Sequence, residues 1–437
     1  MRISVIGLGY LGAVHAASMA KLGHDVVGVD VDAAKVDALA AGTPPFYEPG
    51  LGELLTEVSA TGRLQVTTDL SAVRGAQVHF VCVGTPQRAD GYAADLTYVD
   101  AAIQNLTAHL SAGEIVVGKS TVPVGTAERL AEVVRRAVPG AHLAWNPEFL
   151  REGFAVQDTL SPDRIVYGVP GGEAAVTVTA ALDAVYEAPL STGIPRIVSD
   201  LPTAELVKVA ANSFLATKIS FINAMAELCE VAGADVTQLA DAIGHDARIG
   251  RRFLNAGLGF GGGCLPKDIR AFMARADELG AGEAVAFLGE VDAINIRRRV
   301  RMVELAREVL DGSITGKRVT VLGASFKPDS DDVRDSPALD VAARLSELGA
   351  VVTVHDPQAI DNARAKQPRL HYERDLEAAL AGADAVLLLT EWRQYRDLDP
   401  ERVGTLVAQR TILDGRNALS RTAWTDAGWQ YRALGRR

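Results

Sequence analysis

The feature that most constrains the fold is a glycine-rich turn between a short buried strand and a helix near the start of the chain. The strand covers residues 3–6, the turn reads GLGYLG at residues 7–12, and a helical pattern covers residues 11–22. Glycines at these spacings permit a tight turn, close approach of a pyrophosphate and close packing of helix on strand. A dinucleotide-binding fold is therefore expected.

The next strand supports this expectation and indicates which dinucleotide is bound. It ends at Asp30, near the separation of about 20 residues at which an acid accepts the ribose 2′-hydroxyl. A carboxylate there would repel a 2′-phosphate, and no arginine follows it in Val31-Asp32. We therefore expect NAD rather than NADP.

Strand and helix patterns alternate at both ends of the chain, which is typical of a parallel α/β sheet. Between them, residues 202–231 form one long helical pattern without internal glycine or proline, and residues 284–310 form another. The predicted fold is α/β, with two Rossmann-like doubly wound domains joined by a long central helix and a helical middle region. The expected domains are residues 1–200, 201–311 and 312–437. The expected strands are residues 3–6, 26–30, 78–83, 115–117, 318–322, 351–355 and 385–389.

Composition excludes several classes of protein. The 55 acidic residues outnumber the 44 basic ones, and no basic run interleaves with aromatics, so no nucleic-acid partner is expected. No apolar stretch approaches the roughly 18 residues of a membrane helix. Three cysteines, at positions 82, 229 and 264, are too few for a disulfide framework or a zinc site. We expect a reduced, cytoplasmic protein without a metal, and a frayed basic end at residues 432–437.

Cys264 is the strongest candidate for chemistry. Four of the five residues 259–263 are glycine, which leaves a bare backbone that a ligand can approach. Pro266 suits the first turn of a helix that continues through Met273. A helix N-terminus and Lys267 both lower the pKa of a thiol, so a nucleophilic thiolate is expected. Cys82 and Cys229 are expected to be buried and structural.

Three further segments carry polar groups whose meaning is open from the residues alone. Glu205, Lys208 and Asn212 share one face of the long central helix, where a ligand-binding role competes with a simple Glu205–Lys208 salt bridge. The carboxylates of the NPEFLRE segment at residues 146–152 could be surface charges. The hydroxyl-bearing loop at residues 120–126 is a weak candidate for ligand binding.

Together these motifs resemble the nucleotide-sugar 6-dehydrogenase family over nearly the whole chain. Besides GLGYLG, the matching segments are GTP at 84–86, STVPVGT at 120–126, NPEFLREG at 146–153, SPDRIVYG at 161–168, ELVKVAANSF at 205–214, FLNAGLGFGGGCLPKD at 253–268 and FKPDSDDVRDSP at 326–337. The resemblance implies a four-electron oxidation of the sugar C6 alcohol of UDP-glucose to a carboxylate by two NAD, through a thiohemiacetal and a thioester on Cys264.

The resemblance also implies roles for individual residues. Catalysis is expected from Cys264, Lys208, Asn212, Asp268, Glu148 and Thr121. Contacts with NAD are expected from Gly7, Gly9, Tyr10, Leu11, Gly12, Asp30, Lys35, Thr85, Thr121, Glu152, Lys267 and Arg334. Contacts with the nucleotide sugar are expected from Glu148, Phe149, Leu150, Arg151, Glu152, Lys208, Asn212, Arg248, Phe253, Leu254, Asn255, Ala256, Gly257, Gly261 and Lys327.

Several alternatives remain open from sequence. GDP-mannose or UDP-N-acetylmannosamine could replace UDP-glucose, although Leu265-Pro266-Lys267-Asp268 argues against the N-acetyl branch. A two-electron hydroxyacid dehydrogenase would need no thiol, and a nucleotide-sugar-binding protein without catalysis would not need Cys264, Lys208 and Asp268. Gly263 departs from relatives, which often carry serine or an aromatic there. We expect a homodimer formed through the central helix, with Arg248 reaching the neighbouring subunit.

Overall fold

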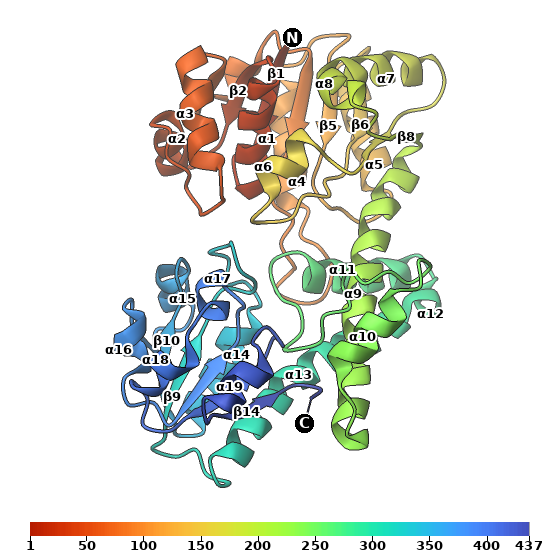
Figure 1. Ribbon diagram of the computed structural model, residues 1–437. Helices are drawn as coiled ribbons and strands as arrows, with labels where there is room; N and C mark the ends of the chain where they lie inside the picture. Colours follow the sequence, from red (N-terminus) through yellow and green to blue (C-terminus); the bar gives the residue numbers. More distant parts are fainter. Residues whose placement is uncertain (437) are drawn as a thin grey trace. The chain divides into compact units, whose positions relative to one another are not determined.

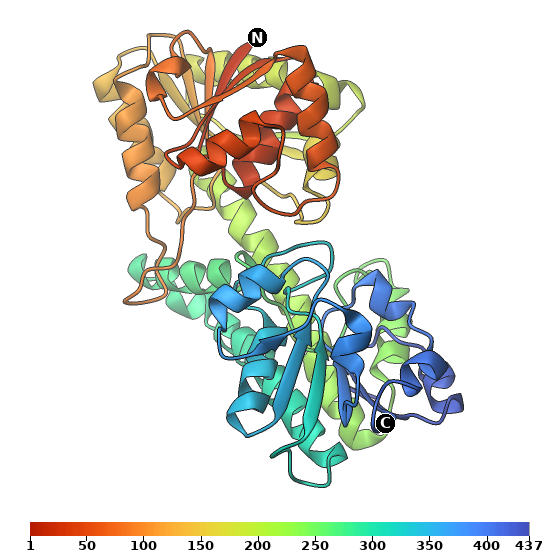
Figure 2. The ribbon, with the colours of Figure 1, turned by 90° about the vertical axis from the view of Figure 1, so that its left-hand side faces the viewer.

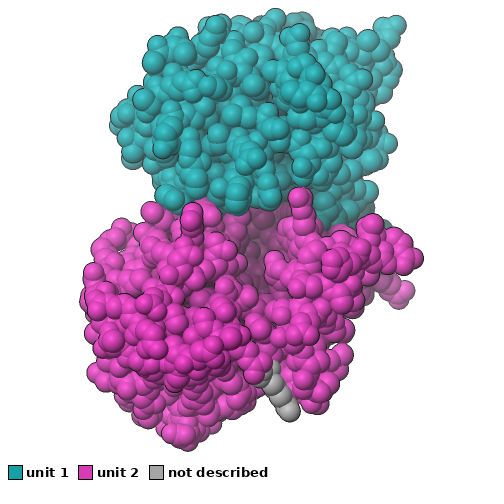
Figure 3. Space-filling model, viewed as in Figure 1, with its two compact units in different colours: residues 1–211, 271–282 teal, residues 212–270, 283–437 magenta. Residues whose placement is uncertain are grey.

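The protein was analysed as a computed structural model, which describes residues 1–436. It divides into two compact units, drawn in teal and magenta in Figure 3. Unit 1 contains Met1–Ala211 and Ala271–Gly282, and unit 2 contains Asn212–Arg270 and Glu283–Arg437. The division into three domains expected from the sequence stays a prediction.

The sheet of unit 1 has eight strands in the order β3-β2-β1-β4-β5-β6-β7-β8. Neighbouring strands pair in parallel, except β6 with β7. The first six strands therefore have the Rossmann order, in which the switch between β1 and β4 places a ligand at the carboxyl ends of the strands. The strands are β1 (Arg2–Ile6), β2 (Asp25–Val29), β3 (Leu64–Thr67), β4 (Val78–Val81), β5 (Ile115–Gly118), β6 (His142–Trp145), β7 (Ile165–Gly168) and β8 (Arg196–Ser199).

Helices cover both faces of this sheet, as Figures 1 and 2 show. Side chains of α1, α3, α6 and α7 form an apolar core with one face. Those of α4, α5 and the start of α9 (Leu201–Ala232) form a second core with the other face. Burial on both faces explains why the strands are near-continuous apolar runs. The helices are α1 (Tyr10–Lys21), α2 (Ala33–Ala40), α3 (Leu51–Thr61), η1 (Leu70–Val73), α4 (Thr97–Thr107), α5 (Thr126–Ala137), α6 (Ala155–Leu160), α7 (Glu173–Val185) and α8 (Glu187–Ser191).

The sheet of unit 2 has six parallel strands in the order β11-β10-β9-β12-β13-β14. Numbered from its own first strand, this is the same order as β1–β6, so the two predicted Rossmann-like folds are confirmed. The strands are β9 (Arg318–Leu322), β10 (Val351–His355), β11 (His371–Tyr372), β12 (Ala385–Leu388), β13 (Thr411–Asp414) and β14 (Gln430–Ala433); the helices between them are α14 (Pro337–Glu347), α15 (Ile360–Lys366), α16 (Leu376–Leu380), α17 (Arg393–Arg396), α18 (Pro400–Gly404) and α19 (Arg421–Asp426).

The likeness between the two folds extends to single contacts. The backbone turns at Gly7 and at Gly323, where φ is +89° and +109°. The next backbone N–H donates to the acid at the end of the second strand, from Leu8 to Asp30 over 2.6 Å and from Ala324 to Asp356 over 2.7 Å.

The long central helix is α9 (Leu201–Ala232), which confirms the pattern read over residues 202–231. The second long helix, α13 (Phe287–Val309), begins three residues later than expected. The shorter helices of this region are α10 (Val236–Gly244), α11 (Leu265–Glu278) and α12 (Gly282–Val285).

Two further expectations concern the C-terminal end of the chain and the presence of membrane-spanning helices. The expected frayed end is wrong for residues 432–436, because β14 includes Arg432 and the Arg436 guanidinium pairs with Asp235 at 3.0 Å. Arg437 lies outside the described residues. Within residues 1–436, no helix combines the length and apolarity that a membrane crossing needs.

Candidate functional site

The three glycines of the GLGYLG turn have the distinct roles that its spacing predicts. A Cβ on Gly7 would lie 2.8 Å from a Val83 methyl, and one on Gly12 would lie 1.8 Å from the Gly7 carbonyl oxygen. A Cβ on Gly9, the residue before α1, would meet nothing within 4 Å. The turn is therefore tight at Gly7 and Gly12 and open at Gly9. That opening is where a phosphate can approach the helix N-terminus.

Asp30 lies directly after β2 and turns toward this opening. Its buried carboxylate accepts hydrogen bonds from the backbone of Leu8 at 2.6 Å and Asp32 at 3.0 Å, and the Lys35 ammonium lies 3.3 Å away. These contacts fix the carboxylate beside the turn, where it can accept a ribose hydroxyl. The residues present fit an NAD, and the contact of Lys35 with that cofactor stays a prediction.

The corresponding acid of unit 2 is occupied by protein donors. Asp356 accepts hydrogen bonds from the backbone of Ala324 and Ser325, at 2.7 and 3.0 Å, and from the Trp392 indole at 3.2 Å. These donors surround the carboxylate where a ribose would bind. The turn Gly323-Ala324-Ser325-Phe326 lacks the glycine pattern of residues 7–12, so the sequence predicts that this domain binds something other than NAD, or nothing. The geometry agrees with that prediction.

Sequence reasoning missed Glu48, which joins the turn to the NPEFLREG segment. Its buried carboxylate accepts hydrogen bonds from the Tyr10 hydroxyl, from Gly153 N–H at 2.6 Å and from Ala155 N–H at 2.7 Å. Glu152 is also buried beside this junction. The signal in the sequence was a single acid in a loop. Two of its partners, Gly153 and Ala155, lie 105 and 107 residues away, so pattern alone could not find them.

The loops after β4 and β5 lie side by side, as expected of loops at the carboxyl ends of neighbouring strands. The Thr85 hydroxyl donates to the Thr121 carbonyl at 2.8 Å, and the Ser120 hydroxyl donates to the Val83 carbonyl at 2.6 Å. The structure thus brings together two of the expected NAD contacts, Thr85 and Thr121.

Glu205 does not form the salt bridge with Lys208 that was considered from sequence. Its carboxylate accepts hydrogen bonds from Gly125 N–H and Ala127 N–H, both at 2.7 Å, and so caps α5 from α9. Burial raises the pKa of Glu205 to about 7, although the two N–H donors act in the opposite direction. Its role in the site is to hold the loop that carries Thr121.

Lys208 instead faces the loop after β6. Its ammonium lies 5.4 Å from the centre of the Phe149 ring, and the Arg164 guanidinium covers that ring at 3.9 Å. Arg151, expected near the sugar, pairs with Asp158 at 2.7 Å at the surface. The Glu148 carboxylate accepts hydrogen bonds from the backbone of Phe149 at 2.7 Å and of Leu150 at 3.0 Å.

Cys264 is exposed and directly precedes α11, as predicted. The Cys264 carbonyl accepts the N–H of Asp268 at 2.9 Å, and the buried Asp268 carboxylate accepts the side-chain amide of Asn212 at 2.7 Å. The Lys267 ammonium lies 2.8 Å from the same carboxylate. Four of the predicted site residues therefore meet at one helix N-terminus. Cys82 and Cys229 are buried, as expected.

The glycines before Cys264 differ from expectation, because protein atoms rather than open space lie against them. A Cβ on Gly259 would lie 2.2 Å from the Asn295 side chain, and one on Gly261 would lie 2.3 Å from the Asp335 carbonyl oxygen. A Cβ on Gly263 would meet the Arg334 guanidinium at 2.3 Å. The departure at Gly263 thus leaves room for Arg334, whose carbonyl also accepts Gly262 N–H at 2.9 Å.

Arg416 is a second residue that sequence reasoning missed. Its half-buried guanidinium donates to the carbonyls of Leu389 at 2.7 Å, Gly259 at 2.8 Å and Phe326 at 3.3 Å. It therefore fixes the glycine loop from the end of β13. The Lys327 ammonium, which was predicted to bind substrate, lies 5.5 Å from the Phe326 ring in the same region.

The remaining expected sugar contacts lie in the 253–257 loop, apart from Arg248. Phe253 has a positive φ of +66°, which side chains rarely adopt. Gly257 N–H donates to the Asn223 side chain at 2.9 Å, and the Ala256 carbonyl accepts the Asn417 amide at 3.1 Å. Leu254 is buried and Asn255 is exposed. Arg248 lies outside this loop, exposed and paired with Asp246 at 2.6 Å.

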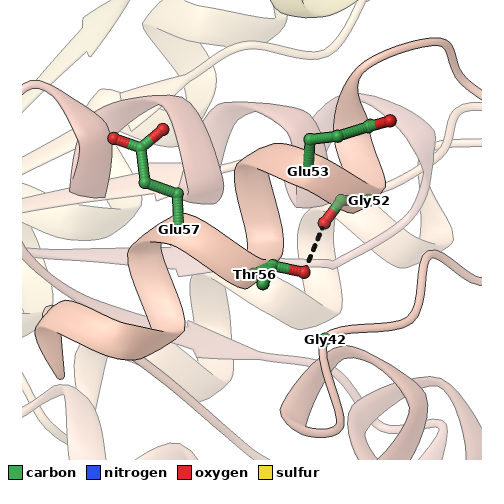
Figure 4. A pocket seen from close by; sticks show the side chains of 5 residues that line it. All are labelled: Gly42, Gly52, Glu53, Thr56 and Glu57. Carbon is green, nitrogen blue, oxygen red and sulfur yellow. Dashed lines mark hydrogen bonds between the residues drawn. The ribbon is translucent and has the colours of Figure 1, made fainter.

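A surface hollow elsewhere in unit 1 contributes nothing to this site. Figure 4 shows it beside α3, where the Thr56 hydroxyl donates to the Gly52 carbonyl at 2.9 Å. None of its lining residues was predicted to bind a ligand. They are Gly42, Gly52, Glu53, Thr56 and Glu57.

Comparison with known protein families covers most of the chain. Residues 1–189 match the NAD binding domain of the UDP-glucose/GDP-mannose dehydrogenase family. Residues 202–297 match the central domain of that family, and residues 320–421 match its UDP binding domain. The cofactor of the chain is therefore NAD, and the second Rossmann-like fold is a UDP-binding domain.

Individual relatives agree over the full length. The chain is 42% identical to UDP-glucose 6-dehydrogenase TuaD of Bacillus subtilis (strain 168), covering 100% of this chain and 93% of that protein. It is also 42% identical to UDP-glucose 6-dehydrogenase of Rhizobium meliloti (strain 1021), covering 100% of each chain. A solved UDP-glucose dehydrogenase from Pyrobaculum islandicum superposes with a TM-score of 0.89 at 40% identity, over 100% of this chain and 98% of that one. The chain thus belongs to the UDP-glucose/GDP-mannose dehydrogenase family and is an NAD-dependent oxidoreductase.

Proposed function

We propose that the enzyme oxidises UDP-glucose to UDP-glucuronate in two successive two-electron steps, with Cys264 as the covalent nucleophile. The observation that carries this proposal is the exposed thiol at the start of α11, next to the linked side chains of Asn212, Asp268 and Lys267. The full-length relatives named UDP-glucose 6-dehydrogenase support the choice of substrate.

The first step converts the C6 alcohol to an aldehyde: C6 gives up a hydride and the hydroxyl gives up its proton to a base, and neither transfer needs a thiol. NAD supplies the hydride acceptor at both oxidations. The Cys264 thiolate then adds to the aldehyde carbon, and the resulting thiohemiacetal still carries the hydrogen that the second oxidation removes. Lys208 and Asn212 follow one another by one turn of α9 and serve as donors to the oxygen of the adduct. In comparable oxyanion sites, one donor contributes about 3 kcal/mol.

The last step is hydrolysis of the thioester that the second oxidation leaves on Cys264. A water oxygen bonds to the carbonyl carbon, the carbon–sulfur bond breaks, and the thiolate leaves as the acid forms. Glu148 accepts the proton of that water. The N-terminus of α11 stabilises the negative charge of the thiolate and so favours it as the leaving group.

A panel of nucleotide sugars tests the substrate and the electron count together. We expect UDP-glucose to give two NADH for each molecule of acid, with much lower kcat/KM for GDP-mannose and UDP-N-acetylmannosamine. UDP-N-acetylmannosamine is included because a solved UDP-D-ManNAc dehydrogenase from Pyrococcus horikoshii superposes on this chain. The TM-score is 0.86 at 27% identity, over 100% of this chain and 99% of that one. One NADH per sugar, as in a two-electron dehydrogenase, contradicts the mechanism.

The working state in this proposal is a homodimer that buries an apolar stripe on α9. Phe214, Phe221 and Leu228 are spaced by seven residues along this helix and are 66%, 49% and 61% exposed. Residues seven apart share one helix face, and an exposed stripe of this kind is typical of a subunit contact. A second copy fits because the stripe is long enough to pair with itself. Arg248, exposed in the same unit, is then available to the neighbouring subunit.

A further inference from the structure

Unit 1 contains a lysine that is almost completely buried and that the mechanism above does not use. Lys119 directly follows β5, and its side chain is 3% exposed. Its ammonium lies 2.9 Å from the Asn146 side-chain oxygen, 3.2 Å from Glu148 Oε2 and 3.4 Å from the Tyr186 hydroxyl. The three protons of the ammonium thus have three oxygen partners.

The partners of Lys119 are themselves held in place. The Tyr186 hydroxyl donates to the Asn146 side-chain oxygen at 2.6 Å, and the Asn146 amide nitrogen donates to the Val166 carbonyl at 2.9 Å. These bonds fix which end of the Asn146 amide faces Lys119. The ring centres of Phe80 and Tyr186 each lie 5.9 Å from the ammonium.

Glu148 is the counter-ion of this buried cation. Burial is the largest single influence and acts to lower the pKa of Lys119, but the adjacent Glu148 carboxylate, together with Tyr186 and Cys82, outweighs it, so the pKa lies above its usual range. The other titratable groups facing Lys119 are Cys82, Tyr186 and His15. Burial raises the pKa values of Cys82 and Tyr186 to about 12 and lowers that of His15, which leaves all three neutral near pH 7.

The two oxygens of Glu148 consequently have different environments. Oε1 accepts the backbone N–H groups of Phe149 and Leu150, whereas Oε2 faces the Lys119 ammonium. The Glu148 side chain remains 17% exposed, so a water can reach it. Without Lys119, the carboxylate would keep its backbone bonds but lose the contact that fixes Oε2.

We propose that Lys119 is a positioning residue for thioester hydrolysis, which holds the Glu148 carboxylate in the orientation that accepts the proton of the attacking water. This inference rests on the function proposed above. It predicts that loss of Lys119 slows one step, release of the acid from Cys264, and leaves both oxidations and substrate binding in place.

The test compares Lys119→Met with wild type during the first turnover on UDP-glucose and NAD. We expect the burst of two NADH per subunit to persist and the hydrolysis that follows to slow by about 10- to 100-fold, as for a misplaced catalytic group. Intact mass spectrometry should then show the sugar acyl group accumulating on the enzyme. The KM values for UDP-glucose and NAD should change by less than about twofold, because the substitution leaves unchanged the interactions that bind the ground state and the transition state equally. Hydrolysis at the wild-type rate overturns the inference.

Two further variants separate this inference from the proposed function. Glu148→Gln removes the proton acceptor and should slow hydrolysis about 100-fold. The double variant Lys119→Met/Glu148→Gln should be no slower than Glu148→Gln alone, because Lys119 acts through Glu148. If the double variant slows hydrolysis by the product of the two single effects, the positioning role is wrong. Absence of any adduct in Glu148→Gln argues against the proposed function itself. Lys21→Met, which breaks a surface lysine–glutamate pair with Glu57 in the same unit, is the matched control and should behave as wild type.

A variant that keeps both charges covers the case in which Lys119→Met fails to fold. Tyr186→Phe removes the hydroxyl that lies 3.4 Å from the ammonium and bonds to Asn146. Loss of one such bond should slow hydrolysis about two- to fivefold, with the NADH burst unchanged. An unchanged hydrolysis rate contradicts the proposed network.

Discussion

Glu205 illustrates how one buried carboxylate connects the central helix to a loop of the site. It extends from α9 to the N-terminus of α5 and caps Gly125 and Ala127 there. Its folded pKa of about 7 lies above the unfolded value of roughly 4.3. The folded state therefore binds a proton on the Glu205 carboxyl more tightly than the unfolded state does. The stability that Glu205 contributes is complete below about pH 4 and is lost as the pH rises through 7.

Substitution by glutamine tests this dependence. The glutamine of Glu205→Gln cannot ionise, so this side chain gives the free energy of unfolding of the variant no dependence on pH. We expect any advantage of wild type over Glu205→Gln at pH 5 to shrink by pH 8, by on the order of 3 kcal/mol in free energy of unfolding. Thermal unfolding of both proteins at four pH values measures the difference. A difference that is constant or grows with pH contradicts the assignment.

Single residues were predictable where a local motif defines their role, and not where their partners are distant in sequence. Gly7, Gly9 and Gly12 could be assigned because their functions depend on the turn that contains them. Glu48 and Lys119 could not, because their partners lie on other strands and loops. Glu48 and Gly153, for example, are 105 residues apart. Glu205 was recognised as a candidate, but helical spacing suggested only Lys208 as a protein partner and gave no information about α5.

At the scale of elements, the seven strands expected from sequence and the two long helices were predicted closely, whereas seven further strands of the described residues were not predicted. Strands buried on both faces are uninterrupted apolar runs, so their positions are evident from sequence. The lack of glycine and internal proline predicted α9 to within a residue at each end. The glycine loop before Cys264 was expected to leave its backbone open to a ligand, whereas Asn295 and Asp335 pack against it. Both residues come from segments that no local pattern connects to the loop.

The exposed stripe of α9 predicts the oligomeric state. Phe221 lies in the middle of this stripe, so Phe221→Lys would bury a charge in a self-association contact, which is costly without a partner ion. Light scattering should give twice the chain mass for wild type and the single-chain mass for the variant, with activity falling as dimer is lost. Val176→Lys, at an exposed apolar position on α7, is the matched control and should remain dimeric. A fully active wild-type monomer would refute the proposed dimer.

At the scale of the whole molecule, one strand order occurs twice and supports two different binding functions. In unit 1 the acid after the second strand faces an open turn at Gly9, whereas in unit 2 the equivalent Asp356 is surrounded by protein donors. The family comparison assigns NAD to the first fold and UDP to the second. Sequence alone predicted the repeated architecture and the loss of the glycine pattern, but not the donors that occupy Asp356.

The central claim is that Cys264 is required to convert the aldehyde to the acid and not for the first oxidation. The measurement is the yield of UDP-glucuronate from Cys264→Ala by mass spectrometry, with NADH recorded in parallel and binding of NAD and UDP-glucose checked by calorimetry. Alanine removes the sulfur that forms the adduct while leaving the helix N-terminus of α11 in place. The account predicts that acid formation is abolished while both ligands still bind with nearly wild-type affinity. Acid produced by Cys264→Ala at close to the wild-type yield would contradict it.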